Sequence, residues 1–249
     1  MKTMCAFAAL AGVVSCAAAD YHQWDFSRGM PGSYGINDAG GRIESIRTTF
    51  DPSSQDFSFS VNFSNSITQG FWLAISPGPN PKGHAGELAL MYFDARISGD
   101  ARLTIYNYNG ENGASSYRDG SPLSGTQTPD RVLTSLSPSF APALSVAESS
   151  GGRSFSIAFN AAAVNGHNPL YPAAGGNDWT GLAFGEQLGI WFHPVANLSS
   201  SYNNDGWLTN FGGTQGWIDG SGFTTTLVPA PGSLALVGLA GLCVARRRR

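Results

Sequence analysis

The stretch DFSFSVNF, residues 56–63, alternates apolar and polar side chains without exception. Its three phenylalanines and Val61 fall on one face of an extended chain, and its serines and Asn62 fall on the other. A period of two residues predicts a β-strand with one buried face and one solvated face. The stretch RSFSIAFN, residues 153–160, repeats the pattern. These two stretches favour an all-β protein.

Seven further stretches have the composition of strands. Two of them, 70–76 and 86–94, are apolar on both faces, which predicts central strands covered on both sides. Asn-Gly and Asp-Gly pairs between the strands are typical of tight turns. The seven stretches are residues 42–50, 70–76, 86–94, 102–108, 131–136, 186–193 and 222–228.

Strands of this number with little helical periodicity predict a single β-sandwich of jelly-roll type over residues 20–228, with loops at 109–130 and 194–221. The one helical signal is at residues 160–166, where Asn160 is expected to cap a single turn that ends at Asn165-Gly166. A domain of this length can bury a sizeable core without disulfides.

Charge and cysteine divide the chain into three parts. Residues 20–228 contain nine basic and 17 acidic side chains, a net charge of −8, and no cysteine. The remaining basic residues and all three cysteines lie near the two ends. A net acidic domain with few basic side chains argues against nucleic-acid binding.

The first part, residues 1–19, predicts a signal peptide. Lys2 precedes an uncharged apolar run over residues 4–14, and small residues lead to a cleavage site after Ala19. The apolar run is too short for a transmembrane span of about 20 residues. An alternative is a lipobox around Cys16, in which that cysteine would be lipidated and become the first residue.

The third part, residues 229–249, has three elements in order. Pro229, Ala230, Pro231 and Gly232 lead into an uncharged apolar stretch at 234–245, and the chain ends on Arg246, Arg247, Arg248 and Arg249. Twelve helical residues span about 18 Å, less than a hydrocarbon core of about 30 Å. Such a helix inserts marginally, and the arginines favour a C-terminus on the cytoplasmic side.

This tail resembles the PEP-CTERM sorting signal of bacterial surface proteins, with Ala230 where the family usually has glutamate. The resemblance implies that the chain is a substrate of exosortase, an integral-membrane transpeptidase. It further implies that signal peptidase and exosortase are partners, that the C-terminal helix anchors the chain in the membrane before processing, and that the product reaches the cell surface or extracellular matrix.

Catalytic motifs are not found in the sequence. Nucleophile-elbow, zincin, P-loop and dinucleotide-binding patterns are missing, and the carboxylates are isolated from one another. We therefore expect a non-catalytic structural or adhesive protein without catalytic residues. Distant carboxylates can still converge in a fold, which leaves a glycan-active hydrolase as the third hypothesis.

No metal site is predicted from the four histidines, because no two of them have ligand spacing. Calcium is the one cofactor that the sequence suggests, at the amide- and acid-rich segments 107–112 and 203–206. The favoured explanation for these residues is that they stabilise turns.

Polysaccharide binding is the second hypothesis, because flat aromatic faces can stack on sugar rings. Trp72 and Trp191 lie in apolar strands and are expected in the core, whereas the other four tryptophans, Trp24 among them, lie in loop-like surroundings. The loop at 77–87 adds a proline-stiffened segment with a lysine and a histidine. The candidate glycan-binding residues are Trp179, Trp207, Trp217, Lys82 and His84.

Overall fold

The computed structural model describes residues 20–81, 87–96, 100–108, 130–168 and 179–229. The predicted signal peptide, the tail beyond Pro229 and residues 109–129 of the predicted loop lie outside the described residues. Of the described residues, 63% are in strands and 2% are helical, and two antiparallel sheets pack together. The prediction of an all-β sandwich is therefore confirmed.

The first sheet, sheet A, contains both ends of the compact unit Tyr21–Val228. Its first and last strands are neighbours, because Tyr21 pairs with Val228 and Gln23 with Thr226. In spatial order its strands are β15 (Thr226–Val228), β1 (Tyr21–Ser27), β3 (Ile43–Phe50), β4 (Asp56–Phe63), β10 (Gly152–Asn160) and β9 (Ala143–Ser149).

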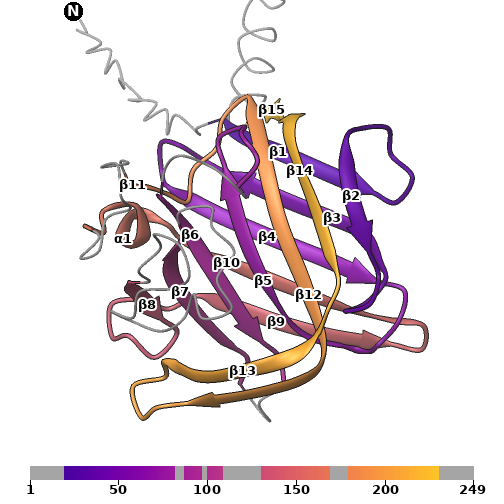
Figure 1. Cartoon of the computed structure of the whole chain (residues 1–249). Helices are drawn as coiled ribbons and strands as arrows, with labels where there is room; N and C mark the ends of the chain where they lie inside the picture. The colour runs from indigo at the N-terminus through magenta and orange to yellow at the C-terminus, as the bar shows by residue number, and fades with distance from the viewer. Residues whose placement is uncertain (1–19, 82–86, 97–99, 109–129, 169–178, 230–249) are drawn as a thin grey trace, which may run out of the picture. The chain divides into compact units, whose positions relative to one another are not determined.

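The second sheet, sheet B, lies in front of sheet A in Figure 1. Two strands lie off its main order: β11 (Trp179–Gly181) pairs in parallel with β6 (Glu87–Asp94), and β13 (Leu208–Gln215) pairs with β12 (Gln187–Tyr202). The main order is β2 (Tyr34–Asn37), β14 (Trp217–Thr224), β12 (Gln187–Tyr202), β5 (Thr68–Ser76), β6 (Glu87–Asp94), β7 (Arg102–Tyr108) and β8 (Arg131–Thr134).

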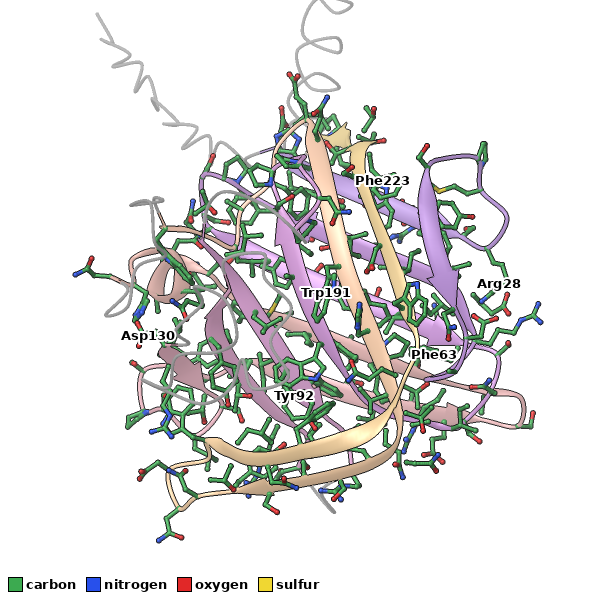
Figure 2. The ribbon with its side chains drawn as sticks, in the orientation of Figure 1. Arg28, Phe63, Tyr92, Asp130, Trp191 and Phe223 are labelled. Carbon is green, nitrogen blue, oxygen red and sulfur yellow. The ribbon has the colours of Figure 1, made fainter. Side chains whose placement is uncertain are left out.

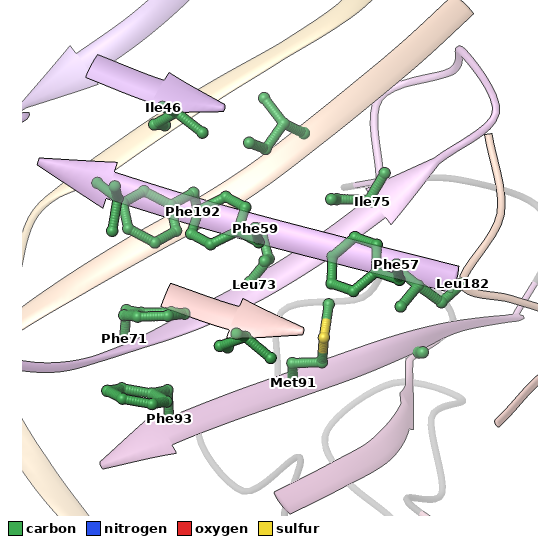
Figure 3. Close-up of a cluster of buried hydrophobic side chains, with 14 of the residues drawn as sticks. Ile46, Phe57, Phe59, Phe71, Leu73, Ile75, Met91, Phe93, Leu182 and Phe192 are labelled. Atoms are coloured by element: carbon green, nitrogen blue, oxygen red, sulfur yellow. The ribbon is translucent and has the colours of Figure 1, made fainter. Parts of the chain in front are cut away.

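The main core lies between the two sheets and is rich in phenylalanine. The apolar face of β4 is buried as its alternation predicts, while Ser58, Ser60 and Asn62 face outward. The ring of Phe59 lies 5.6 Å from that of Phe71 and 5.4 Å from that of Phe192, across the gap between the sheets (Figure 3). Apolar burial of this kind supplies the main driving force for a domain without disulfides.

The outer face of sheet B is also covered over β5, β6 and β7, which confirms that β5 and β6 are central strands buried on both sides. A second core forms there around Trp72, Tyr92 and Tyr106. Its cover comes from the second half of β12 and from β13, which we call the arm (residues 197–215). In Figure 1 this hairpin bends across the lower part of sheet B. Leu198 and Leu208 of the arm pack into the second core.

The prediction of a loop at 194–221 is wrong. β12 continues to Tyr202, and β13 and most of β14 also lie within these residues. Asn197 has a φ of +52°, which interrupts the ladder between Ala196 and Ser199 and lets the strand bend. The segment escapes prediction because its serines, glycines and asparagines have low strand propensity and are ordered by the contacts of the second core.

The single helical turn is present as α1 (Ala162–Asn165), with Gly166 as its C-cap. Its N-cap is Ala161 and not Asn160, although the Asn160 side chain accepts a hydrogen bond of 3.1 Å from the Ala162 amide. The predicted strand at 222–228 is two strands, the end of β14 and β15. β1, β2, β9, β11 and β13 are additional to the predicted strands.

Candidate functional site

An aromatic surface forms on the outer face of sheet B where β12 and β14 are neighbours. Asp219 pairs with Trp191 and Ile218 with Phe192, so Trp217 lies beside His193. Phe192 and Ile218 are fully buried in the main core, and the alternating residues therefore point away from it. We call Trp191, His193, Trp217, Asp219 and Gln215 the Trp-His-Trp surface; Figure 2 labels Trp191.

The three rings of this surface form a row. The His193 imidazole is stacked on Trp191, with ring centroids 3.8 Å apart and planes 28° apart. Trp217 continues the row, with its centroid 6.4 Å from that of His193. The Trp217 side chain is 39% exposed, although large apolar groups normally become buried. The row thus presents a flat, partly solvated aromatic face.

Polar groups border the aromatic row. His193 Nδ1 lies 3.3 Å from Gln215 Oε1, and His193 Nε2 lies 3.3 Å from Asp219 Oδ1. The second distance is within reach of an ion pair, but the atoms are not aligned for a hydrogen bond. Both atoms are buried, and neither has a hydrogen-bond partner within the described part of the chain. The Asp219 side chain is nevertheless partly exposed, so a ligand can approach its carboxylate from the side of Oδ2.

The edge strand β2 lies beside the Trp217 indole. Gly35 of β2 pairs with Asp219, and a Cβ added to it would lie 3.8 Å from Trp217 Nε1, an ordinary van der Waals contact.

The other predicted glycan-binding tryptophans lie elsewhere. Trp207 is half-buried against the second core, with the Arg131 guanidinium 5.4 Å from its ring. Trp179 donates a hydrogen bond of 3.0 Å to the Val164 carbonyl and packs against the main core. Lys82 and His84 lie outside the described residues. The structure therefore does not bring Trp179 or Trp207 into the row with Trp217.

Two tryptophan expectations need correction. Trp24 is not in a loop but in β1, where it is 2% exposed and packs on Phe223 with ring centroids 5.0 Å apart. Trp191, which is expected in the core, is half-buried and packs against the second core on the outer face of sheet B. The alternation of residues 188–193 contains this signal, because Trp191 and His193 fall on the face opposite Ile190 and Phe192.

A buried polar cluster joins the end of β6 to the arm. The fully buried Asp94 carboxylate accepts hydrogen bonds of 2.5 Å from Ser200 Oγ and 2.8 Å from the Tyr202 hydroxyl. Burial, together with the nearby charge of Asp94, raises the pKa of both Tyr92 and Tyr202 far above the usual tyrosine range. Because every group in it serves to hold the arm, we assign this cluster a structural role.

A second buried carboxylate lies at the opposite end of β7. Asp130 Oδ2 lies 2.8 Å from His167 Nε2, and the imidazole meets the Trp179 ring edge-on. The Asn107 side chain accepts a hydrogen bond from the Asp130 amide. Of the predicted calcium segment 107–112, only Asn107 and the backbone of Tyr108 are described.

The segment 203–206 makes a turn. Asn203 Oδ1 accepts hydrogen bonds from the backbone amides of Asp205, at 3.1 Å, and Trp207, at 2.8 Å. This bonding is what the turn explanation requires. Within the described ranges, no three His, Cys, Asp or Glu side chains form a group that could hold a metal ion.

The described residues include no helix with the length and apolar character needed to cross a bilayer. Comparisons of the chain with protein-family models, with curated proteins and with solved structures give no match.

Proposed function

We propose that this protein is an exported cell-surface or extracellular-matrix protein whose β-sandwich is a non-catalytic, adhesive module that binds polysaccharide. The observation that supports the binding role is the Trp-His-Trp surface. Its aromatic row can stack on the apolar faces of sugar rings, while Asp219 and Gln215 can accept hydrogen bonds from sugar hydroxyls.

Binding rather than hydrolysis is favoured by the number of carboxylates. A glycosidase of the usual kind flanks the scissile bond with two carboxyl groups. The Trp-His-Trp surface has one, Asp219, and this residue lies beside a histidine instead of a second acid. A glycan-active hydrolase is thereby the weaker alternative for this surface.

Export and sorting are supported by the sequence of the two ends. We propose that residues 1–19 are removed by signal peptidase after Ala19 and that exosortase processes the Pro-Ala-Pro tail. Before that step the short apolar helix and Arg246–Arg249 anchor the chain in the membrane. A jelly-roll-like connectivity of the sandwich belongs to the same proposal.

The binding proposal is tested with the secreted full-length product on insoluble and soluble polysaccharides. Trp217→Ala should weaken binding by about tenfold or more, which corresponds to about 1.4 kcal/mol. The matched control is Leu227→Ala, because Leu227 is 55% exposed on β15 of the other sheet. Unchanged binding by the Trp217 variant would contradict the proposal.

The sorting proposal has its own experiment in a host that carries an exosortase. Deletion of Arg246–Arg249 should leave the unprocessed precursor in the membrane fraction, while replacement of the four arginines by lysine should preserve processing because the charge is kept. Normal maturation of the deletion variant would refute the proposed role of the arginine cluster.

A further inference from the structure

The charge of the Trp-His-Trp surface bears on which polysaccharide it accepts. Asp219 is the acidic group of this surface, and its side chain is 23% exposed, so it remains within reach of a ligand. Its Oδ1 is buried beside His193 Nε2 and has no hydrogen-bond partner among the described residues, so a ligand reaches the carboxylate from the side of Oδ2. A half-buried carboxylate with unused acceptor capacity is stabilised when a positively charged donor arrives.

The arginines of the described residues are engaged elsewhere. Four arginines pair with carboxylates: Arg28 with Asp38, Arg42 with Glu44, Arg47 with Asp25 and Arg153 with Glu148. Arg96 donates to the Leu198 carbonyl and to Ser200, and Arg102 and Arg131 lie over the rings of Tyr202 and Trp207. Among the described residues, the basic neighbour of Asp219 is the imidazole of His193, on the side of Oδ1.

The neighbouring rings favour the same kind of ligand. Trp191 is the cross-strand partner of Asp219, and Trp217 is two residues away on the same face of β14. Indole faces attract ammonium groups, by about 0.5–1 kcal/mol at exposed sites. An ammonium group at this position would meet a carboxylate and an aromatic face together. A uronate carboxylate would instead meet Asp219 and a domain of net charge −8.

We infer that the Trp-His-Trp surface selects a polysaccharide whose sugar rings carry protonated amino groups, and discriminates against uronic acid polymers. This inference rests on the function proposed above and names its ligand class. The rings would stack on the sugars, and Asp219 would receive a charge-assisted hydrogen bond from the ammonium group.

The experiment compares three polymers with the mature secreted protein at low salt and at a mildly acidic pH, where the amino groups of the polymer are protonated. They are a partly deacetylated polyglucosamine, the same polymer fully N-acetylated, and a polyuronate. The amine-bearing polymer should bind about tenfold more tightly than its N-acetylated form, and this preference should fall as salt screens the charges. The polyuronate should bind weakest.

Two variants distinguish binding at the Trp-His-Trp surface from a general attraction of a positively charged polymer to an acidic protein. Asp219→Asn should remove the preference for the amine, whereas Asp205→Asn removes one charge at an exposed turn of the arm and should retain it. Thermal unfolding of each variant shows that the fold is intact. A preference that Asp219→Asn and Asp205→Asn change equally would overturn the inference.

The remaining outcomes distinguish this inference from the proposed function. Equal affinity for the amine-bearing and N-acetylated polymers, with binding still lost in Trp217→Ala, would overturn the amine preference and leave the adhesive function standing. Stronger binding of the polyuronate than of the amine-bearing polymer would likewise overturn the amine preference and leave the adhesive function standing. Failure to bind any of the polymers, or binding insensitive to Trp217→Ala, would count against the proposed function itself.

Discussion

The Tyr202 hydroxyl donates a 2.8 Å hydrogen bond to the carboxylate of Asp94, which lies 108 positions earlier in the chain. Ser200 Oγ donates to the same carboxylate oxygen, at 2.5 Å. Asp94 ends β6, whereas both donors belong to the arm (Figure 2 labels Tyr92 beside this cluster). One buried acid thus fastens the arm over the second core.

Replacing Asp94 should weaken the attachment of the arm to the second core. We expect Asp94→Ala to lower the free energy of unfolding by about 2–4 kcal/mol, because two partly buried hydroxyls lose a charged acceptor. Urea unfolding followed by tryptophan fluorescence measures the loss, since Trp72 and Trp207 belong to or pack on the second core. Asp205→Asn is the control, expected within about 0.5 kcal/mol of the parent protein. Equal stability of Asp94→Ala and the control would contradict the assigned role of Asp94.

The buried tyrosines should resist ionisation. Burial raises the pKa of Tyr92 and Tyr202, so the stability that their neutral forms contribute is complete below the usual tyrosine pKa of about 10 and is lost as pH rises above it. A spectrophotometric titration of the eight tyrosines should show at least two that ionise only when the protein unfolds. Tyr202→Phe should reduce that number by one. Reversible titration of all eight near pH 10 with the fold retained would refute the expectation.

The phenylalanine core predicts a large effect at Phe59. This ring is fully buried and contacts rings of sheet B, so Phe59→Ala should cost about 3–5 kcal/mol. Ser60 is the next residue and lies on the outer face, where Ser60→Ala should change stability by less than about 0.5 kcal/mol. Chemical denaturation of the pair measures the difference. Similar midpoints would mean that the two faces of β4 are wrongly assigned.

A close backbone approach makes Gly40 sensitive to the smallest side chain. A Cβ at this position would lie 2.5 Å from the Gly216 amide nitrogen and would overlap the Pro194 carbonyl oxygen. Gly40→Ala should therefore destabilise the fold by about 1–3 kcal/mol. At Gly151 an added Cβ has no neighbour within 4 Å, and Gly151→Ala should be nearly neutral. Thermal unfolding of both variants checks the contrast, and an unaffected Gly40→Ala would be inconsistent with this packing.

Where apolar and polar residues alternate strictly, the sequence can predict the first and last residues of a strand correctly. β4 has the bounds expected for it, because its apolar face repeats every second position, and β7 also has its expected bounds. The arm could not be predicted in this way. Its strands are rich in serine, glycine and asparagine, and they are ordered by contacts with Tyr92 and Tyr106, which are distant in sequence. Long-range packing outweighed local propensity there.

The candidate site, too, could be predicted from the sequence only in part. Trp217 could be selected from the sequence as a tryptophan in polar surroundings, and it is exposed in the structure. Its partners could not be selected, because the row depends on the register that pairs Asp219 with Trp191. A sequence shows which residues share a face of one strand, but not which strand lies beside it.

The pairing of Tyr21 with Val228 has a mechanical consequence. A domain tethered through its C-terminal end receives any pulling force first at β15, which is joined to β1 by three residue pairs and has Leu227 mostly exposed. Peeling this strand breaks few contacts and uncovers little apolar surface, while β1 remains paired with β3 along its length. Under load, β15 would detach from β1 first and could pair with it again afterwards. The domain would thus lengthen slightly while its core stays intact.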